Sequence, residues 1–339
     1  MARTAVVLMN LGGPDSLEAV EPFLFNLFSD PAILRLPWLL RMPLARLITR
    51  GRVRTAREIY ARLGGASPLL ANTAAQAEAL DRLLGADHRS FIAMRYWHPT
   101  SEEAARAVAE WAPDEIVCLP LYPQFSTTTT ASSLADWRQA ATKLGLDHPT
   151  RIVCCYPAEA GFVEAVAGLI RPVLDQASGL ANPPRLLLTA HGLPRKIVNA
   201  GDPYPLQVEL TARAVVAALA APGLDWQVCY QSRVGPLEWI GPETNAEIRR
   251  AGAERVPLVV APIAFVSEHS ETLVELDLDY REIAENCGVP GYFRVPTVGV
   301  EPAFIAALAG LVRRSGMASS AAACAAVAGG RCALAGASV

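Results

Sequence analysis

Two stretches of the chain run alike, VVLMNLGGP at residues 6–14 and LLLTAHGLP at residues 186–194. Each passes from an apolar run typical of a buried parallel strand, through polar positions, into a turn of Gly and Pro. A second echo follows in each half, VCLP at 117–120 and VVAP at 259–262, before a Ser-bearing segment typical of a helix start. The chain is therefore predicted to contain two similarly built halves.

Short apolar runs alternate with amphipathic segments along both halves. In segments such as 73–84 and 101–111, apolar residues recur at helical spacing. This alternation predicts an α/β fold in which crossover helices cover parallel sheets. The runs expected to form strands are Ala5–Met9, Phe91–Met94, Ile116–Leu119, Arg151–Cys154, Arg185–Leu188, Gln227–Tyr230 and Leu258–Ala261.

The length of 339 residues suits two domains better than one. We expect an N-terminal domain over residues 1–160, a C-terminal domain over 161–316 and an Ala/Gly-rich extension over 317–339. In open α/β sheets ligands bind outside the carboxyl ends of the strands, so the functional cleft is expected there.

The composition predicts a folded, reduced protein with no affinity for polyanions. Hydrophobic residues make up 52% of the chain and charged residues 19%, which supplies ample apolar surface for compact cores. A net charge of −3 with scattered Lys and Arg gives no basic field, so nucleic acid is not expected as a partner. Several of the seven cysteines lie in or beside apolar runs, which indicates reduced core thiols and a reducing compartment.

The N-terminal part of the chain predicts a cytoplasmic protein. A strand-like run begins at Ala5, which leaves no room for the charged and apolar regions of a secretory signal. The most membrane-like segment, 23–48, contains Pro31, Pro37, Pro43 and three arginines, so it is not expected to span a bilayer. It is suited instead to peripheral contact with the inner face of a membrane.

His191 stands where a predicted strand ends. Strand-like residues precede it and a Gly-Leu-Pro turn follows, which places its ring at the carboxyl end of the strand. A core or turn histidine that bonds a backbone carbonyl is the alternative for a lone His. Here the loop NAGDPYP at 199–205 adds polar groups to the same rim of the sheet. His191 is therefore a candidate catalytic residue.

A second cluster of titratable residues follows at 267–280, SEHSETLVELDLDY. On a helix, Glu271, Glu275 and Asp279 stand at i, i+4 and i+8, so three carboxylates share one face. No Lys or Arg lies in this segment to offset their repulsion. One interpretation is an acidic helix exposed to water. The other is a row of acids that passes a divalent metal ion or displaced protons towards a site.

Aromatic and cationic side chains follow other predicted strands. Arg95 and Tyr96 come directly after the run that ends at Met94 and are expected to form an exposed cluster. Such a cluster suits a flat aromatic ligand with carboxylates, and Trp239, in a loop braced by Gly and Pro, is similar. Surface packing is the alternative for each. No GxGxxG or P-loop lysine pattern occurs, so a nucleotide cofactor is not expected.

Taken together, these motifs resemble those of the ferrochelatase family. They occur in the family's order and cover about residues 5 to 310. The resemblance implies two Rossmann-like domains, each with a parallel four-stranded sheet, around a porphyrin cleft. The matching segments are LMNLGGP (8–14), GGASPL (64–69), MRY (94–96), LYPQFS (121–126), TAHGLP (189–194) with GDPY (201–204), QSRVGP (231–236) and the helix at 268–280.

The resemblance also implies roles for single residues. His191 matches the active-site histidine, and Glu271 matches its acidic partner across the macrocycle, so these two are the expected catalytic residues. The segment 23–48 is similar to the family's apolar lip, which also touches membrane. The expected metal-side groups are His191, Glu271, Glu275 and Asp279, and the expected porphyrin contacts are Leu11, Arg95, Tyr96, Trp239 and His269.

Some members of the family bind a [2Fe–2S] cluster through one internal cysteine and three near the C-terminus. Cys155 matches the internal position, and Cys324 and Cys332 resemble the outer two of the terminal set. Val327 stands at the middle position. A cluster needs four protein ligands, usually thiolates, so this substitution counts against a cluster here.

The expected activity is the insertion of Fe²⁺, as a substrate, into protoporphyrin IX by an enzyme of haem synthesis. Neutral His191 would accept a pyrrole proton while the acids at 271–279 guide protons or Fe²⁺. The sequence leaves open coproporphyrin III as the substrate, a non-catalytic porphyrin or haem carrier, and a chelatase that loads cobalt or nickel into another tetrapyrrole. It also leaves open whether the protein is a monomer or a homodimer.

Overall fold

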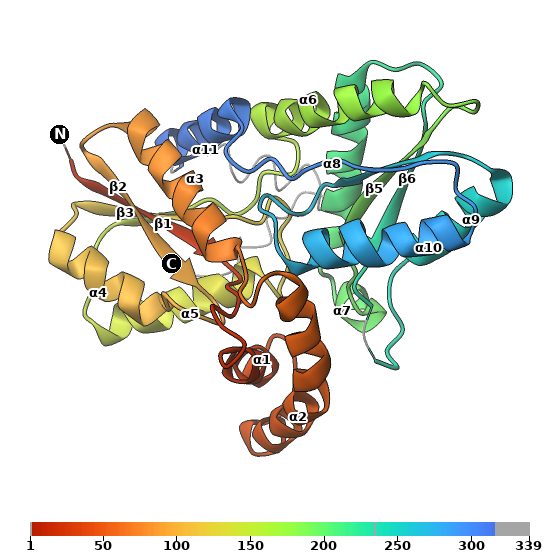
Figure 1. The fold of residues 1–339 in the computed structure, drawn as a ribbon. Helices are drawn as coiled ribbons and strands as arrows, with labels where there is room; N and C mark the ends of the chain where they lie inside the picture. Colours follow the sequence, from red (N-terminus) through yellow and green to blue (C-terminus); the bar gives the residue numbers. More distant parts are fainter. Residues whose placement is uncertain (1, 234, 316–339) are drawn as a thin grey trace. The chain divides into compact units, whose positions relative to one another are not determined.

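The computed structural model describes residues 2–233 and 235–315, which form two compact units (Figure 1). The first unit contains the chain up to Cys155 and the described residues from Leu308 onward. The second unit runs from Tyr156 to Ala307. Each unit contains one four-stranded parallel sheet. The predicted α/β class with two four-stranded parallel sheets is therefore confirmed.

The first sheet has the strand order β2-β1-β3-β4. Its central strand β1 is buried at every position, as its continuous apolar run predicts for a strand covered on both faces. The strands are β1 (Thr4–Asn10), β2 (His88–Met94), β3 (Glu115–Pro120) and β4 (Thr150–Ile152), and the helices are α1 (Val20–Ser29), α2 (Trp38–Arg62), α3 (Leu69–Leu84), α4 (Ser101–Trp111) and α5 (Thr130–Lys143).

The second sheet has the order β6-β5-β7-β8, which repeats the first with β5 in the place of β1. The echo between residues 6–14 and 186–194 therefore reflects equivalent strands in two similar sheets. The strands are β5 (Arg185–His191), β6 (Asp225–Gln231), β7 (Leu258–Pro262) and β8 (Tyr292–Arg294), and the helices are α6 (Ala160–Ala177), α7 (Arg195–Asn199), α8 (Tyr204–Leu219), α9 (Thr244–Glu254), η1 (Glu271–Asp279), α10 (Tyr280–Asn286) and α11 (Pro302–Arg314).

Helix starts and cores follow the residue patterns. Thr100 and Glu103 form a capping box at the start of α4, where each side chain bonds the backbone N–H of the other. In the second unit, Leu187 and Val260 of the sheet pack with Leu276 of η1 in one buried cluster. This packing fixes η1 beside the strands that carry the polar residues.

Two elements differ from the sequence prediction. The strand β8 has only three residues, and Arg294 interrupts their apolar run. The acidic segment forms a π-helix, η1, rather than an α-helix. The backbone N–H of Tyr280 bonds the carbonyl of Glu275, five residues earlier, where an α-helix would bond four residues earlier.

The described residues include no helix with both the length and the apolar character that a bilayer crossing requires. The predicted C-terminal extension at 317–339 lies outside the described residues. Cys324, Val327 and Cys332 therefore lie outside them as well.

Candidate active site

The carboxyl ends of β5 and β6 carry the first polar residues of the site. His191 ends β5 and lies opposite Gln231, which ends β6. The turn after His191 requires glycine, because a Cβ at Gly192 would lie 2.9 Å from the carbonyl oxygen of Gln231 and 3.2 Å from Cε3 of Trp239. The strand end therefore holds the imidazole, as the sequence predicts, with the indole packed beside the turn.

The helix η1 brings an acid to His191. Nδ1 of His191 lies 2.8 Å from Oε2 of Glu271. Because an ionised carboxylate only accepts hydrogen bonds, Nδ1 carries the proton, and Nε2 of the neutral ring is left as the proton acceptor. The His191 side chain is 42% exposed and that of Glu271 26%, so the pair is accessible to a ligand.

The pair shifts both pKa values. Burial alone would lower the pKa of His191, but the charge and hydrogen bond of Glu271, with a further contribution from Glu275, raise it. Burial alone would raise the pKa of Glu271, but the charges of His191 and His269 and the Ser232 hydroxyl lower it to about 2. Between these two values the pair is ionic.

This ion pair stabilises the fold over a defined pH range. For Glu271 the stabilisation is present above the ordinary carboxyl pKa of 4.5 and is lost as the pH falls to about 2. For His191 it is present below the ordinary imidazole pKa of 6.5 and is lost as the pH rises through the raised value.

Glu275 is held by four donors. Its Oε1 accepts from the backbone N–H of Ser232 at 2.8 Å and from the Tyr280 hydroxyl at 2.8 Å. Its Oε2 accepts from Nε2 of Gln231 at 3.0 Å and from the Ser232 hydroxyl. A carboxylate has about four lone-pair sites, so all of them are occupied. Oε1 of Glu271, in contrast, accepts no hydrogen bond from the residues that the structure describes.

Ser232 connects the two acids through an unusual backbone conformation. Its φ of 61° lies in the left-handed region, which residues other than glycine seldom adopt, and unlike Ala112, Ala220 and Arg255 it does not cap a helix. Its hydroxyl lies 3.1 Å from Oε2 of Glu271 and also reaches Glu275. On an α-helix, residues four apart drift by about 40° around the axis. The wider turn of η1 gives this pair a different offset, and in it both acids contact the Ser232 hydroxyl.

The acids do not form a ready-made coordination site. Within residues 2–233 and 235–315, no group of three His, Cys, Asp or Glu side chains is arranged to hold a metal ion. Of the predicted metal-side residues, His191 contacts Glu271, and Glu275 is engaged by Ser232 and its neighbours. Asp279 lies half-buried at the last position of η1.

His269 lies beside the His191–Glu271 pair, but its environment shifts its pKa in the other direction. Its ring is tilted by 57° against that of Phe265, with centroids 4.6 Å apart, and its Nε2 is 3.9 Å from Oε2 of Glu271. Burial lowers its pKa and outweighs the opposite effects of Glu271 and Glu268. The two histidines therefore have pKa values shifted in opposite directions, that of His191 upward by its carboxylate partner and that of His269 downward by burial.

The predicted cluster at Arg95 and Tyr96, in the first unit, is not exposed. Tyr96 is only 2% exposed, and its hydroxyl donates to Oδ2 of Asp30 at 2.7 Å. The Arg95 guanidinium pairs with the same oxygen at 2.9 Å and with Asp136 at 3.5 Å. Leu11 packs against the apolar cluster that contains Tyr96. The expectation of an exposed cluster is therefore wrong, because distant carboxylates satisfy it internally.

Replacing Asp30 with alanine is expected to destabilise the protein by about 3 kcal/mol, because Tyr96 loses its acceptor and the largely buried Arg95 keeps only its longer ion pair with Asp136. Asp30 is 3% exposed and also accepts from Ser132. Urea unfolding measures the change, and Asp15→Ala, at an exposed carboxylate, is the control. A loss below about 1 kcal/mol for D30A would contradict this reading of the network.

Cys155 is the candidate cluster ligand that the structure describes. It is 5% exposed and packs with Phe125 and Cys154 in a buried cluster. With valine at 327, the donor set contains three of the four thiolates that a [2Fe–2S] cluster usually needs. The residues present do not fit that group.

Several residues of the site escaped prediction from the sequence. Gln231 and Ser232 belong to the QSRVGP segment, which directly follows a predicted strand. Their position after that strand could have identified them as candidate site residues. Tyr280 ends the acidic segment and carried no separate signal. Phe265 lies in the loop that leads to η1 and reads as an ordinary apolar residue.

Comparisons with known proteins identify the family of this chain. A family model described as Ferrochelatase matches residues 3–316. The chain is 56% identical to the ferrochelatase of Phenylobacterium zucineum over 325 residues, with 93% of each chain covered. It is 55% identical to the ferrochelatase of Caulobacter vibrioides (strain NA1000 / CB15N) over 318 residues, covering 92% of this chain and 90% of that one.

A solved structure shares the fold. SirB from Bacillus subtilis with Fe³⁺ aligns with a TM-score of 0.54 at 12% identity, covering 94% of this chain and 97% of that one. The extent of the family match and the identity to both relatives lead to one conclusion. The chain belongs to the ferrochelatase family of metal-chelatase enzymes.

Proposed function

We propose that this protein inserts Fe²⁺ into protoporphyrin IX and releases two protons, in the synthesis of haem. The observation that carries the proposal is the accessible pair of His191 and Glu271, whose nitrogen and oxygen lie 2.8 Å apart. Free-base porphyrin has two pyrrole N–H groups, and both protons must leave as the metal enters. A base at the ring therefore accelerates the exchange.

His191 is the proposed base. With Nδ1 bonded to Glu271, its Nε2 accepts a pyrrole proton, and Glu271 stabilises the imidazolium that results. The exposed edge of the ring then passes this proton to water before the second one is taken. His191 thus handles one proton at a time, and two cycles release both.

Glu271 is proposed to guide the metal rather than the protons. With a pKa of about 2 it stays ionised near neutral pH and holds no proton to pass on. Its Oε1 accepts no hydrogen bond from the described residues, so this oxygen is available to a divalent cation. Glu275 and Asp279 extend the acidic face from which Fe²⁺ would approach. Of the two roles that the sequence leaves open, the geometry favours cation guidance.

The porphyrin contacts remain those that the family resemblance implies. In the second unit, Trp239 and His269 lie next to Gly192 and Glu271 respectively, and we propose that they contact the macrocycle. In the first unit, Leu11, Arg95 and Tyr96 keep their proposed role at the ligand.

A metallation assay tests the proposal. Purified protein is mixed with protoporphyrin IX or coproporphyrin III and with Fe²⁺, Co²⁺ or Zn²⁺, and the porphyrin absorbance is followed. We expect metal-dependent turnover, with kcat/KM for protoporphyrin at least about tenfold higher. Faster turnover of coproporphyrin III would show that it, and not protoporphyrin IX, is the substrate. Porphyrin binding without metallation would show that the protein is a carrier.

We also propose that the protein is cytoplasmic and contacts the inner face of a membrane through α2. Four large apolar residues of this helix are 62–74% exposed: Trp38, Leu39, Leu40 and Leu47. The helix also carries seven arginines and one acid. Apolar and cationic residues on one helix favour an anionic lipid surface, and such a surface would supply a poorly soluble porphyrin.

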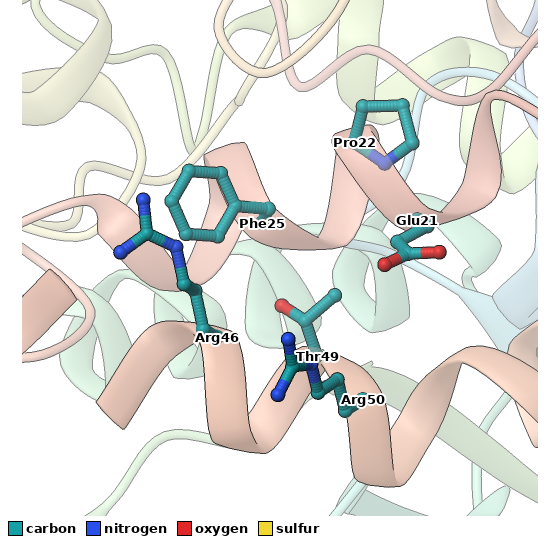
Figure 2. Close-up of a pocket in the computed structure, with 6 residues that line it drawn as sticks. All are labelled: Glu21, Pro22, Phe25, Arg46, Thr49 and Arg50. Atoms are coloured by element: carbon teal, nitrogen blue, oxygen red, sulfur yellow. The ribbon is translucent and has the colours of Figure 1, made fainter. Parts of the chain in front are cut away.

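A cavity of about 370 Å³ between α1 and α2 supports this contact. Figure 2 shows Phe25 and Glu21 of α1 facing Arg46, Thr49 and Arg50 of α2. Neither arginine has a carboxylate partner among the described residues, and the buried Thr49 hydroxyl has no hydrogen-bond partner there. The cavity therefore offers cationic and hydroxyl donors to a lipid phosphate.

Replacing both Arg46 and Arg50 with glutamine is expected to weaken binding to anionic vesicles about 30-fold, since each basic residue near such a surface contributes about 1 kcal/mol. Sedimentation with phosphatidylcholine vesicles, with and without phosphatidylglycerol, measures this. Arg82→Gln, on α3, removes an exposed charge as a control. Equal binding of the double variant and R82Q would exclude the cavity as a headgroup site.

A further inference from the structure

An arginine on the short strand β8 holds two acids at the back of the site. Nε and Nη2 of Arg294 bond the two oxygens of Asp277 at 2.8 and 2.6 Å, a bidentate fork. Nη1 bonds Oε1 of Glu268 at 2.5 Å. The Arg294 side chain is 12% exposed, so this contact is largely shielded from water.

The two acids lie on either side of the catalytic carboxylates in the sequence. Glu268 immediately precedes His269 and stands three residues before Glu271, and Asp277 stands two residues after Glu275. Residues two apart on a helix point to different faces. Arg294 therefore binds one face of η1 through Asp277, and Glu275 on another face contacts Ser232.

We propose that Arg294 is a positioning residue for iron insertion: by clamping Glu268 and Asp277 to β8, it holds η1 in the winding that brings Glu271 to His191. The proposal rests on the function proposed above and deepens it. It adds a residue that does not touch the reacting atoms.

The winding of η1 needs support from outside the helix. Long π-helical segments are rare, because the α-helical alternative is favoured unless tertiary contacts prevent it. The strand β8 supplies two such contacts. Besides the Arg294 fork, the Tyr292 hydroxyl donates to the carbonyl of Leu276, in the middle of η1, at 2.8 Å. Reversion to an α-helix would change the angle between Glu271 and Glu275 around the helix axis, and with it the contacts of both acids with Ser232.

The second unit contains a matched control. Arg185, 8% exposed, also bridges two carboxylates, those of Asp225 at 2.7 Å and Glu254 at 2.8 Å. It begins β5, whereas His191 ends the same strand, about 20 Å away at about 3.3 Å per residue. Loss of Arg185 therefore removes a buried arginine from two carboxylates, here 51% and 44% exposed, without reaching the site.

The test compares Arg294→Met, Arg294→Lys and Arg185→Met with the unaltered protein. The first readout is kcat and KM of the metallation reaction. The second is the NMR signal of the Nδ1 proton of His191 at one fixed pH, in ¹⁵N-histidine-labelled protein, assigned by its loss in His191→Ala. Thermal unfolding records the structural cost of each change. The groups that face the His191 ring and act on its proton are Glu271 and Glu275 of η1, His269 before η1, and Tyr204 of α8.

R294M is expected to lose the Nδ1 proton signal and to lower kcat about 10- to 100-fold, as is typical when a partner of an active-site ligand is removed. KM for the porphyrin should change much less. R294K should recover part of kcat, because an ammonium can pair with one carboxylate but cannot form the fork. R185M should show a similar fall in melting temperature with a normal signal and kcat.

Two outcomes separate the clamp from the proposed function. A folded R294M that keeps the Nδ1 proton signal would overturn the positioning role, whatever its rate. An R294M that loses the signal but keeps full kcat would support the clamp and remove the His191–Glu271 pair from the chemistry.

Discussion

Replacing His191 with alanine is expected to lower iron insertion about 10²- to 10⁴-fold, the range typical of a lost general base, while porphyrin binding persists. Alanine removes Nε2, which is the proposed proton acceptor, but the sheet and η1 remain. Stopped mixing of Fe²⁺ with porphyrin-loaded protein measures the insertion step, and porphyrin fluorescence measures binding. Near-normal turnover would remove the histidine from the mechanism.

His98 provides a matched control for this substitution. Its Nδ1 lies 2.8 Å from Oε2 of Glu103, the same contact that joins His191 to Glu271, but it is 57% exposed and belongs to the first unit. His98→Ala therefore deletes an equivalent imidazole–carboxylate contact that does not involve His191 or Glu271. We expect unchanged insertion and at most about 1 kcal/mol of lost stability. An equal loss of activity in H98A would show that the effect is not specific to the site.

The sheets could be predicted because their signal is local. The central strands β1 and β5 are continuous apolar runs that end in Gly/Pro turns, and the pattern needs no tertiary information. The strand β8 gave no such signal, since Arg294 interrupts its apolar residues, whereas the equally short β4 is followed by further apolar residues up to Cys154. Arg294 was missed with it, because nothing in the sequence relates an arginine in a short run to acids 17 and 26 residues away.

The acids of the candidate site were predictable, but the winding of the helix that carries them was not. A spacing of four places acids on one face of an α-helix and of a π-helix alike, so Glu271 and Glu275 were found and η1 was not. The prediction that Tyr96 is exposed was wrong for a different reason. Its partner Asp30 stands 66 residues earlier in the chain, and only the folded unit brings the two together.

Glu271→Gln is expected to lower kcat about 10- to 100-fold and to move the acid limb of the pH–rate profile to lower pH. The base works only when His191 is neutral, so the rate falls as the pH drops through the pKa of His191. The Glu271 carboxylate is the main cause that raises this pKa, whereas burial lowers it. Glutamine keeps the shape without the charge, so the limb should shift to lower pH.

The direction of this shift separates two roles of Glu271. If the carboxylate only orients the imidazole, glutamine can still hydrogen bond with the ring, and the limb should stay where it is while kcat changes. If the charge acts on His191, the limb moves to lower pH, and the variant loses least activity under acid conditions. Glu103→Gln removes the same contact from His98 and should leave the profile unchanged. A limb that moved to higher pH in E271Q would contradict both roles, because loss of a negative charge cannot strengthen the proton affinity of its neighbour.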